Sequence, residues 1–184
     1  MTDELTKDQL AKEYKDNVFV QDYTKKAVIE GVVVKELKNM VGEDGDFSEL
    51  VRVNPQGEVE GFPQFKIAQV NRSKILPHAI KAWHVHLKQD EIQHMLPENL
   101  FLVGLLDMRE DSPTKGISMR LVLGGGKAQL LYIPKGVAHG YKNLSKKAGT
   151  ILYFVSEQFT IDDPDELRLP WDTIGADFWE AKKE

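Results

Sequence analysis

Three of the five histidines in this chain stand in two segments whose spacing could bring them into one site. His84 and His86 are separated by one residue in the alternating segment 79–87, so both imidazoles are expected on one face of a strand. His139 lies far along the chain, in the segment 133–143. If the two strands face each other across a barrel, the three imidazoles converge in one mouth. Neutral imidazoles take up protons near neutral pH and also bind metal ions, so both kinds of chemistry are open.

The composition narrows the class of protein. A chain of 184 residues, 41% of them hydrophobic, is long enough for one domain with a sizeable core. The formal net charge of −5 argues against nucleic acid or an anionic membrane as the main partner. No apolar run approaches the roughly 20 residues that cross a bilayer, and residues 1–5 show no secretory signal. The lack of cysteine excludes disulfides and thiolate catalysis and is compatible with a cytoplasmic protein.

The hydrophobic pattern divides this single domain into three parts. Residues 1–26 are expected to form a helical arm, because apolar side chains recur among charges between residues 4 and 17 and would pack on the outside of the domain. Residues 27–160 carry short β-prone runs separated by turns that contain Gly or Pro, a pattern typical of a β-sandwich or barrel. The runs are 28–37, 47–53, 65–70, 79–87, 100–108, 119–123, 128–133 and 150–155.

Residues 161–184 differ in character from the β-prone part. They contain two tryptophans and two prolines, which favour a tail that wraps back on the barrel over a second domain. Within this tail, the acidic run 162–166 is most simply a solvated loop.

Two longer patterns resemble those of the cupins, which are small jelly-roll barrels. The first is His84-x-His86 followed by Glu91. The second is Pro134-x-Gly136-x-x-His139-x-x-x-Asn143, in which Pro and Gly build a turn and the histidine then points into the barrel. The resemblance implies an all-β fold, a cupin double-stranded β-helix with a short N-terminal helix and a wrapping C-terminal tail.

Within the cupins, the chain resembles the dTDP-4-dehydrorhamnose 3,5-epimerase family from about residue 28 to residue 179. In that family a histidine removes the proton next to the keto group of a nucleotide-linked 4-keto-6-deoxy sugar, and a tyrosine on the other face returns one. A proton on such a carbon is only weakly acidic, so the base needs a cation or hydrogen bonds at the enolate oxygen. The segments that carry the resemblance are 45–49, Gln69-x-Asn71-x-Ser73, 81–84, 107–114 and 133–141.

The resemblance assigns roles by position. His84 becomes the base, Lys81 replaces the family's arginine beside the keto oxygen, and Asp172 is the candidate carboxylate that orients His84. Lys81 could instead be a solvated lysine at the end of a strand. The implied activity is that of an isomerase in deoxysugar and cell-surface polysaccharide biosynthesis, which works without a cofactor or metal as a homodimer.

Two departures from the family leave alternatives open. The family's tyrosine pair is replaced by Gln158-Phe159, so Tyr141, or else Tyr132 or Tyr153, would have to supply the phenol. Without a donor, the protein would bind a nucleotide sugar and not turn it over. The His84-x-His86 form is also closer to keto-sugar isomerases and to metal-binding cupins. In that alternative, a divalent transition metal is held by a set of four ligands, namely His84, His86, Glu91 and His139.

Further polar residues are candidates for binding the substrate. Arg52 and Arg109 could hold the diphosphate through bidentate hydrogen bonds. Arg109 could equally pair with a nearby carboxylate, such as Asp107, and fix a turn. Gln69 and Asn71 share one face of their strand, directed inward. His86 and His139 complete the predicted binding set.

Overall fold

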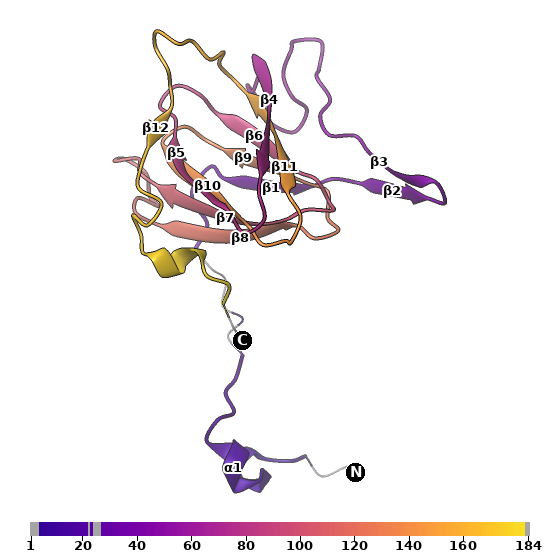
Figure 1. Ribbon diagram of the computed structural model, residues 1–184, viewed down its shortest axis with the longest axis vertical. Helices are drawn as coiled ribbons and strands as arrows, with labels where there is room; N and C mark the ends of the chain where they lie inside the picture. Colours follow the sequence, from indigo (N-terminus) through magenta and orange to yellow (C-terminus); the bar gives the residue numbers. More distant parts are fainter. Residues whose placement is uncertain (1–3, 22, 24–26, 183–184) are drawn as a thin grey trace.

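Two antiparallel sheets of five strands face each other in the computed structural model, which describes residues 4–21, 23 and 27–182 (Figure 1). One sheet has the order β1-β9-β6-β11-β4 and the other β12-β5-β10-β7-β8. This arrangement confirms the predicted all-β jelly-roll barrel. The strands are β1 (Val33–Glu36), β4 (Gln69–Ile75), β5 (Ile80–Val85), β6 (Glu91–Met95), β7 (Leu100–Asp107), β8 (Ser118–Gly124), β9 (Gln129–Ile133), β10 (Val137–Asn143), β11 (Gly149–Val155) and β12 (Leu167–Arg168).

A small hairpin stands out from the barrel and is made by β2 (Asn39–Gly42) and β3 (Gly45–Ser48) (Figure 1). The predictions of strands over 47–53 and 65–70 are wrong for most of their length, because this part of the chain forms turns joined only by isolated bridges. Conversely, β6 was not among the predicted runs. It lies in the middle of its sheet and is buried along its whole length.

The N-terminal segment contains a single turn of α-helix, α1 (Lys12–Lys15), after a short 3-10 turn, η1 (Lys7–Gln9). Neither turn has a buried residue, and Figure 1 shows α1 apart from the barrel. A short helix is therefore present where the sequence predicts it, but its expected packing on the domain is wrong. Among the described residues, no helix has the length and apolar character needed to cross a membrane.

The C-terminal tail packs on the outer face of the sheet that contains β5. Trp83 and Trp179 are both fully buried there, with ring centroids 4.9 Å apart. Both indole N–H groups donate to the carbonyl oxygen of Trp171, which satisfies the polar end of each ring. The tail closes with a 3-10 turn, η2 (Ala176–Trp179). Because Trp83 faces outward, its neighbour His84 faces the interior of the barrel.

An irregularity between β5 and β10 shapes the interior. His139 pairs with His84 and Tyr141 pairs with Lys81, so two residues of β10 span three residues of β5. The extra residue is a β-bulge, which shifts the alternation of side chains. Lys81 and His84 would lie on opposite faces of a regular strand, but the bulge lets both side chains reach the interior.

Candidate active site

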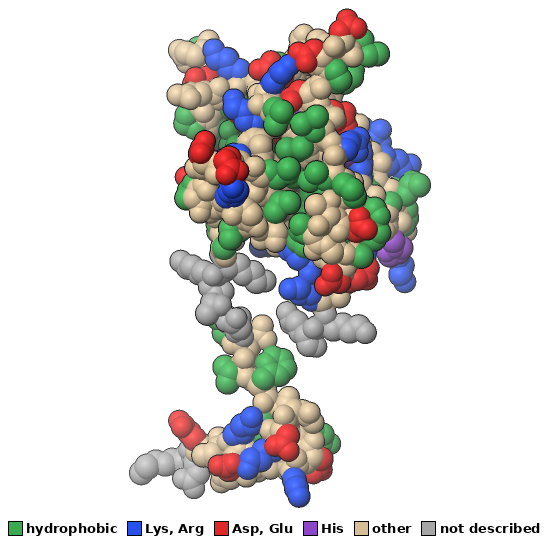
Figure 2. All heavy atoms as spheres, turned by 90° about the vertical axis from the view of Figure 1, so that its left-hand side faces the viewer, with side chains coloured by type: hydrophobic (Ala, Val, Ile, Leu, Met, Phe, Trp, Pro, Cys, Tyr) green, Lys and Arg blue, Asp and Glu red, His purple; other side chains and the backbone are tan. Residues whose placement is uncertain are grey.

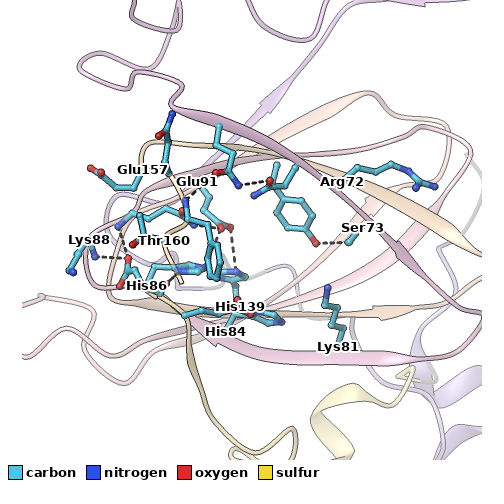
Figure 3. A pocket seen from close by; sticks show the side chains of 18 of the residues that line it. Arg72, Ser73, Lys81, His84, His86, Lys88, Glu91, His139, Glu157 and Thr160 are labelled. Atoms are coloured by element: carbon cyan, nitrogen blue, oxygen red, sulfur yellow. Dashed lines mark hydrogen bonds and ion pairs between the residues drawn. The ribbon is translucent and has the colours of Figure 1, made fainter. Parts of the chain in front are cut away.

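The inner faces of the two sheets enclose a cavity of about 410 Å³ at one end of the barrel. Figure 3 shows His84, His86 and His139 side by side along one wall, with Lys81 farther along it. Residues 157–168, which follow β11 and include β12, run over the mouth of the cavity and are called the roof segment below. The opposite wall is lined by Gln69, Asn71, Ser73, Glu91 and Tyr153.

The site histidines are enclosed by the protein. His84, His86 and His139 are all buried, and so is His94, which lies outside the cavity. On the face drawn in Figure 2, a histidine is visible only at the edge.

His84 is held between two charged side chains of the roof segment. Arg168 Nη1 donates a hydrogen bond to His84 Nε2 at 3.0 Å, and the Glu166 carboxylate lies 3.3 Å from Nδ1. Both contacts follow from the pairing of β12 with β5, which places Arg168 opposite His84. Burial, and then the charges of His139 and Arg168, lower the pKa of His84 to about 3. The imidazole is therefore neutral at neutral pH, as a general base must be.

Glu91 lies between the other two histidines. Its Oε1 is 3.2 Å from His86 Nε2, and its Oε2 is 3.4 Å from His139 Nε2. The side-chain amides of Gln89 and Gln93 donate to these two oxygens at 2.8 and 2.6 Å. Burial acts to raise the pKa of Glu91, but the histidine and amide contacts outweigh it and lower the pKa to about 2. The carboxylate is therefore ionised in the interior.

The two histidines beside Glu91 differ in their pKa. Burial opposes protonation of His86, but the hydrogen bond and charge of Glu91 raise its pKa above the ordinary value. Burial is the largest influence on His139 and lowers its pKa despite the same carboxylate. A proton shared at this cluster therefore resides on His86.

Backbone carbonyls determine which nitrogen of each ring faces Glu91. His86 Nδ1 hydrogen-bonds to the Asp165 carbonyl oxygen, and His139 Nδ1 hydrogen-bonds to the Val137 carbonyl oxygen at 3.4 Å. A carbonyl only accepts, so this network assigns the hydrogen to Nδ1 in both rings. In their neutral forms, both Nε2 atoms then direct a lone pair at a carboxylate. That arrangement is unfavourable unless a cation lies between them, and the cation is either a proton on His86 or a metal ion.

The side chains of His86, Glu91 and His139 fit a metal ion, because a cation between them would relieve this unfavourable arrangement of lone pairs. Ligand atoms of His86, Glu91 and His139 lie within 4.8 Å of one another, which makes them the one such group among the described residues. Imidazoles oriented by backbone carbonyls and a carboxylate held by amides are typical of transition-metal ligands. His84 is not part of the group, because its Nε2 is bonded to Arg168. The four-ligand alternative is thereby corrected to three.

Two tyrosines meet in the cavity from facing walls, with ring centroids 6.4 Å apart. The Tyr153 hydroxyl is hydrogen-bonded to Ser73 at 2.8 Å, whereas the buried Tyr141 hydroxyl has no hydrogen-bond partner among the described residues. Burial raises the pKa of Tyr153 to about 12 and that of Tyr141 well above its ordinary value. Both phenols are therefore protonated at neutral pH. Phe159, which replaces the expected tyrosine, lines the cavity without a hydroxyl.

The roof segment is attached to the barrel by its acidic residues. The Asp165 carboxylate accepts hydrogen bonds from the backbone N–H groups of residues 87–89 at 2.8–2.9 Å. The Lys88 ammonium pairs with Asp163. The expectation of a solvated acidic loop holds for Asp163, whose side chain is 75% exposed, and is wrong for Asp165, which is half-buried and hydrogen-bonded to the barrel. The sequence gives little indication of this attachment. The backbone N–H groups of residues 87–89 need acceptors, but nothing in the sequence shows which residue supplies them.

The structure brings together seven of the ten residues predicted for the site. Lys81 is among them, so its alternative as a solvated lysine at a strand end is not supported. The seven that line the cavity are Gln69, Asn71, Lys81, His84, His86, His139 and Tyr141.

The two arginines predicted to bind diphosphate lie outside the cavity. Arg52 forms an ion pair of 2.8 Å with Glu49 in an exposed loop. Arg109 pairs with Asp107 at 2.8 Å and also donates to the carbonyl oxygen of Glu30. Of the two interpretations of Arg109, the structure thus supports the one in which it fixes a turn.

The prediction that Asp172 orients His84 is corrected by the structure. Asp172 is exposed and forms no ion pair with a histidine among the described residues. The carboxylate beside His84 is Glu166, because the register of β12 on β5 places Arg168 opposite His84 and so brings residues near 166, and not Asp172, to this imidazole. Sequence reasoning did not identify Glu166, Arg168 or Asp165 as part of the site.

Known proteins that resemble this chain are described as polysaccharide biosynthesis proteins, epimerases and sugar isomerases. A sequence model described as dTDP-4-dehydrorhamnose 3,5-epimerase matches residues 26–182. The chain is 43% identical over 150 residues to the spore coat polysaccharide biosynthesis protein SpsL of Bacillus subtilis (strain 168), with 80% of this chain and 95% of that protein covered. It is 31% identical over 145 residues to the probable low-salt glycan biosynthesis epimerase Agl13 of Haloferax volcanii, with 78% and 89% covered. The structure of a dTDP sugar isomerase from Desulfovibrio desulfuricans G20 superposes with a TM-score of 0.69 at 25% identity, over 79% of this chain and 88% of that one.

Proposed function

This chain belongs to the dTDP-4-dehydrorhamnose 3,5-epimerase family, and from that premise we propose that it epimerises or isomerises a nucleotide-linked 4-keto-6-deoxy sugar. The observation that carries the proposal is the state of His84. Its imidazole is buried, neutral and lies in a cavity that also contains a lysine and two protonated tyrosines. A neutral base beside cations suits the removal of a proton next to a keto group.

The proposed reaction begins with proton abstraction. His84 takes the proton from the carbon next to the keto group, and the electron pair of the broken C–H bond forms the enolate. Negative charge then develops on the keto oxygen, where Lys81 supplies a positive charge from the same wall as His84. Glu166, 3.3 Å from Nδ1, stabilises the imidazolium that His84 becomes.

Tyr141 is the proposed donor for the return of the proton. Its side chain is buried and lines the cavity, and its hydroxyl makes no hydrogen bond of good geometry among the described residues, although Gln93 and Tyr153 lie near enough to influence its pKa. The hydroxyl of Tyr153 is instead occupied by Ser73. An unpartnered buried donor is costly to the fold, so its presence in a cavity is consistent with a group that bonds to a ligand.

The test is deuterium uptake from heavy water into a dTDP-4-keto-6-deoxy sugar, followed by NMR. We expect exchange next to the keto group in the wild type and a reduction of roughly 10²- to 10⁴-fold in His84→Ala. His78→Asn is the matched control, because His78 is exposed, lies outside the cavity and has a positive φ that asparagine tolerates. Binding of the nucleotide sugar without any exchange would favour the alternative of a non-catalytic binding protein.

A metal-dependent enzyme is the second candidate, favoured by the lone-pair arrangement around Glu91. His86, Glu91 and His139 would hold a divalent transition ion, which would act as a Lewis acid toward the sugar's oxygens. Metal analysis of the purified protein and titration with Mn²⁺, Ni²⁺ and Zn²⁺ test this candidate. About one ion per chain, lost in His139→Ala together with the exchange activity, would support it. Exchange that survives chelation would exclude it.

Three broader features belong to the proposal. The pathway is the biosynthesis of a deoxysugar for a cell-surface polysaccharide, in line with the names of the two similar proteins. The homodimer expected from the family resemblance remains a prediction, which light scattering can test. The cytoplasmic location also remains a prediction, which cell fractionation can test.

A further inference from the structure

Arg168 occupies the nitrogen that the proposed reaction needs. Its Nη1 donates to His84 Nε2 at 3.0 Å, while Nη2 is held by Glu166 Oε1 at 2.5 Å. The backbone of β12 pairs with that of β5 at Arg168 and His84, so both strands of this pair hold the contact in place. The Arg168 side chain is nevertheless 52% exposed, which leaves it room to move.

This hydrogen bond cannot persist during catalysis. The Nε2 lone pair that accepts from Arg168 is the same lone pair that would take the proton of the sugar. Arginine is charged at any pH that the protein meets, so it only donates and cannot give way by losing a proton. The guanidinium must therefore leave Nε2 when the substrate enters.

The geometry of the reaction fixes where the guanidinium would go. The carbon that loses its proton to Nε2 is bonded directly to the keto carbon, so the keto oxygen enters the space beside His84. Arg168 does not itself line the cavity, but Glu166 does, so a guanidinium that leaves Nε2 while Glu166 retains Nη2 stays tethered to a residue at the edge of that space. We infer that Arg168 is a catalytic residue that covers the base until substrate displaces it, and that it then donates to the keto oxygen as the enolate forms. This inference rests on the proposed function.

Arg168 and Lys81 would then share the oxyanion from different elements. Lys81 comes from β5 through the bulge, and Arg168 comes from the roof segment. Arginine offers several donors in a fixed plane, so one can hold Glu166 while another moves. Closure of the roof segment over the substrate and stabilisation of the enolate would thus be one event.

The test measures kcat and KM for deuterium exchange in Arg168→Ala and Arg168→Lys. We expect kcat to fall roughly 10²- to 10³-fold in Arg168→Ala, with KM changed by less than about threefold. Guanidinium chloride at a concentration below that needed for unfolding should restore part of the activity of Arg168→Ala, while sodium chloride of equal ionic strength should not. Arg120→Ala is the matched control, because Arg120 lies on β8 outside the cavity.

Any of the following results would overturn the inference that Arg168 is catalytic. An unchanged or raised kcat in Arg168→Ala would mean that the arginine only blocks the base. A raised KM with unchanged kcat would mean that it binds the diphosphate. A wild type without exchange would overturn the proposed function as well, whereas an active wild type with an equally active Arg168→Ala overturns this inference alone. If Arg168→Ala does not fold, Arg168→Gln, which keeps length and polarity, provides the same readouts.

Discussion

Two buried carboxylates of this protein, Glu91 and Asp107, lie in opposite chemical situations. Asp107 accepts five hydrogen bonds, three from Arg109 and one each from the hydroxyls of Ser112 and Thr114. The Arg109 contact is the main reason why the pKa of Asp107 lies well below its usual range. Every one of these donors keeps its proton near neutral pH, so this cluster has one state.

Glu91 shares its oxygens with partners that can change. Two amides donate permanently, but the nearby His86 and His139 rings can each be neutral or charged. The carboxylate therefore responds to a proton, an ion or a ligand that enters the cavity. The comparison teaches that burial and low pKa alone do not distinguish a site from a structural cluster. What distinguishes them is whether the partners of the carboxylate can lose their protons.

The largest effect is expected from Asp107→Asn. The new amide would place hydrogens against Arg109, whose donors cannot adapt, so the free energy of unfolding should fall by about 3 kcal/mol. Urea denaturation measures this change. Deuterium exchange by the folded variant should match the wild type, and a loss of exchange at unchanged stability would contradict the structural role.

The same isosteric change at Glu91 should cost much less. In Glu91→Gln, the amide nitrogen that replaces Oε1 can donate to the Nε2 lone pair of a neutral His86, and the Gln89 amide that donated to Oε1 can turn its own oxygen toward it. Stability should therefore fall by less than about 1 kcal/mol. Without the carboxylate, the pKa of His86 should drop below its wild-type value, since Glu91 is what raises it. Urea denaturation and NMR titration of the histidines measure the two effects. A stability loss equal to that of Asp107→Asn would break the comparison.

The contributions of the cavity and of the Asp107 cluster to the stability of the protein should be lost at different pH values. His84 takes up a proton near pH 6.5 in the unfolded chain but only near pH 3 in the folded protein, so its contribution to stability is lost as the pH falls through that interval. Asp107 has a lowered pKa, so its contribution is lost only below about pH 4. His84→Gln should therefore flatten the decline of stability between pH 6.5 and pH 4 in urea denaturation. An unchanged slope would show that His84 is not the group responsible.

At the Asp107 cluster, a smaller effect than that of Asp107→Asn is expected from Arg109→Lys. Lysine keeps the charge beside Asp107 but cannot reproduce the bidentate contact or reach two further acceptors, so about 1 kcal/mol of stability should be lost. The thermal midpoint reports this change. KM for a nucleotide sugar should stay the same. A raised KM would support the alternative that Arg109 binds the diphosphate of the substrate.

Local patterns were sufficient to predict the centre of the site. The alternation around His84 and His86, and the Pro-Gly turn before His139, are short-range signals that determine which face each side chain takes. The predicted convergence of the three histidines is confirmed, but the expected route was wrong, because β5 and β10 are paired neighbours in one sheet and do not face each other across the barrel. The short β-prone runs indicated a sandwich or barrel, and the family resemblance added the cupin fold.

The remaining parts of the site depend on long-range geometry. The position of Lys81 follows from a bulge, which simple alternation does not predict. The choice between Asp172 and Glu166 depends on the path of the tail across β5, and a difference of a few residues in that path changes the carboxylate that reaches His84. The pairing of Arg109 with Asp107 was one of two interpretations that the sequence left equal.

The way in which the roof segment is attached has a consequence for its motion. Its contacts with the barrel are hydrogen bonds and ion pairs, while the side chains of Phe159, Ile161 and Leu167 remain exposed. Opening it therefore exposes little new apolar surface and leaves the core intact. Amide hydrogens of β12 should exchange with solvent by local opening long before those of β10, and added salt should speed that opening by screening the ion pairs. The rate at which product leaves would then depend on ionic strength rather than on the stability of the barrel.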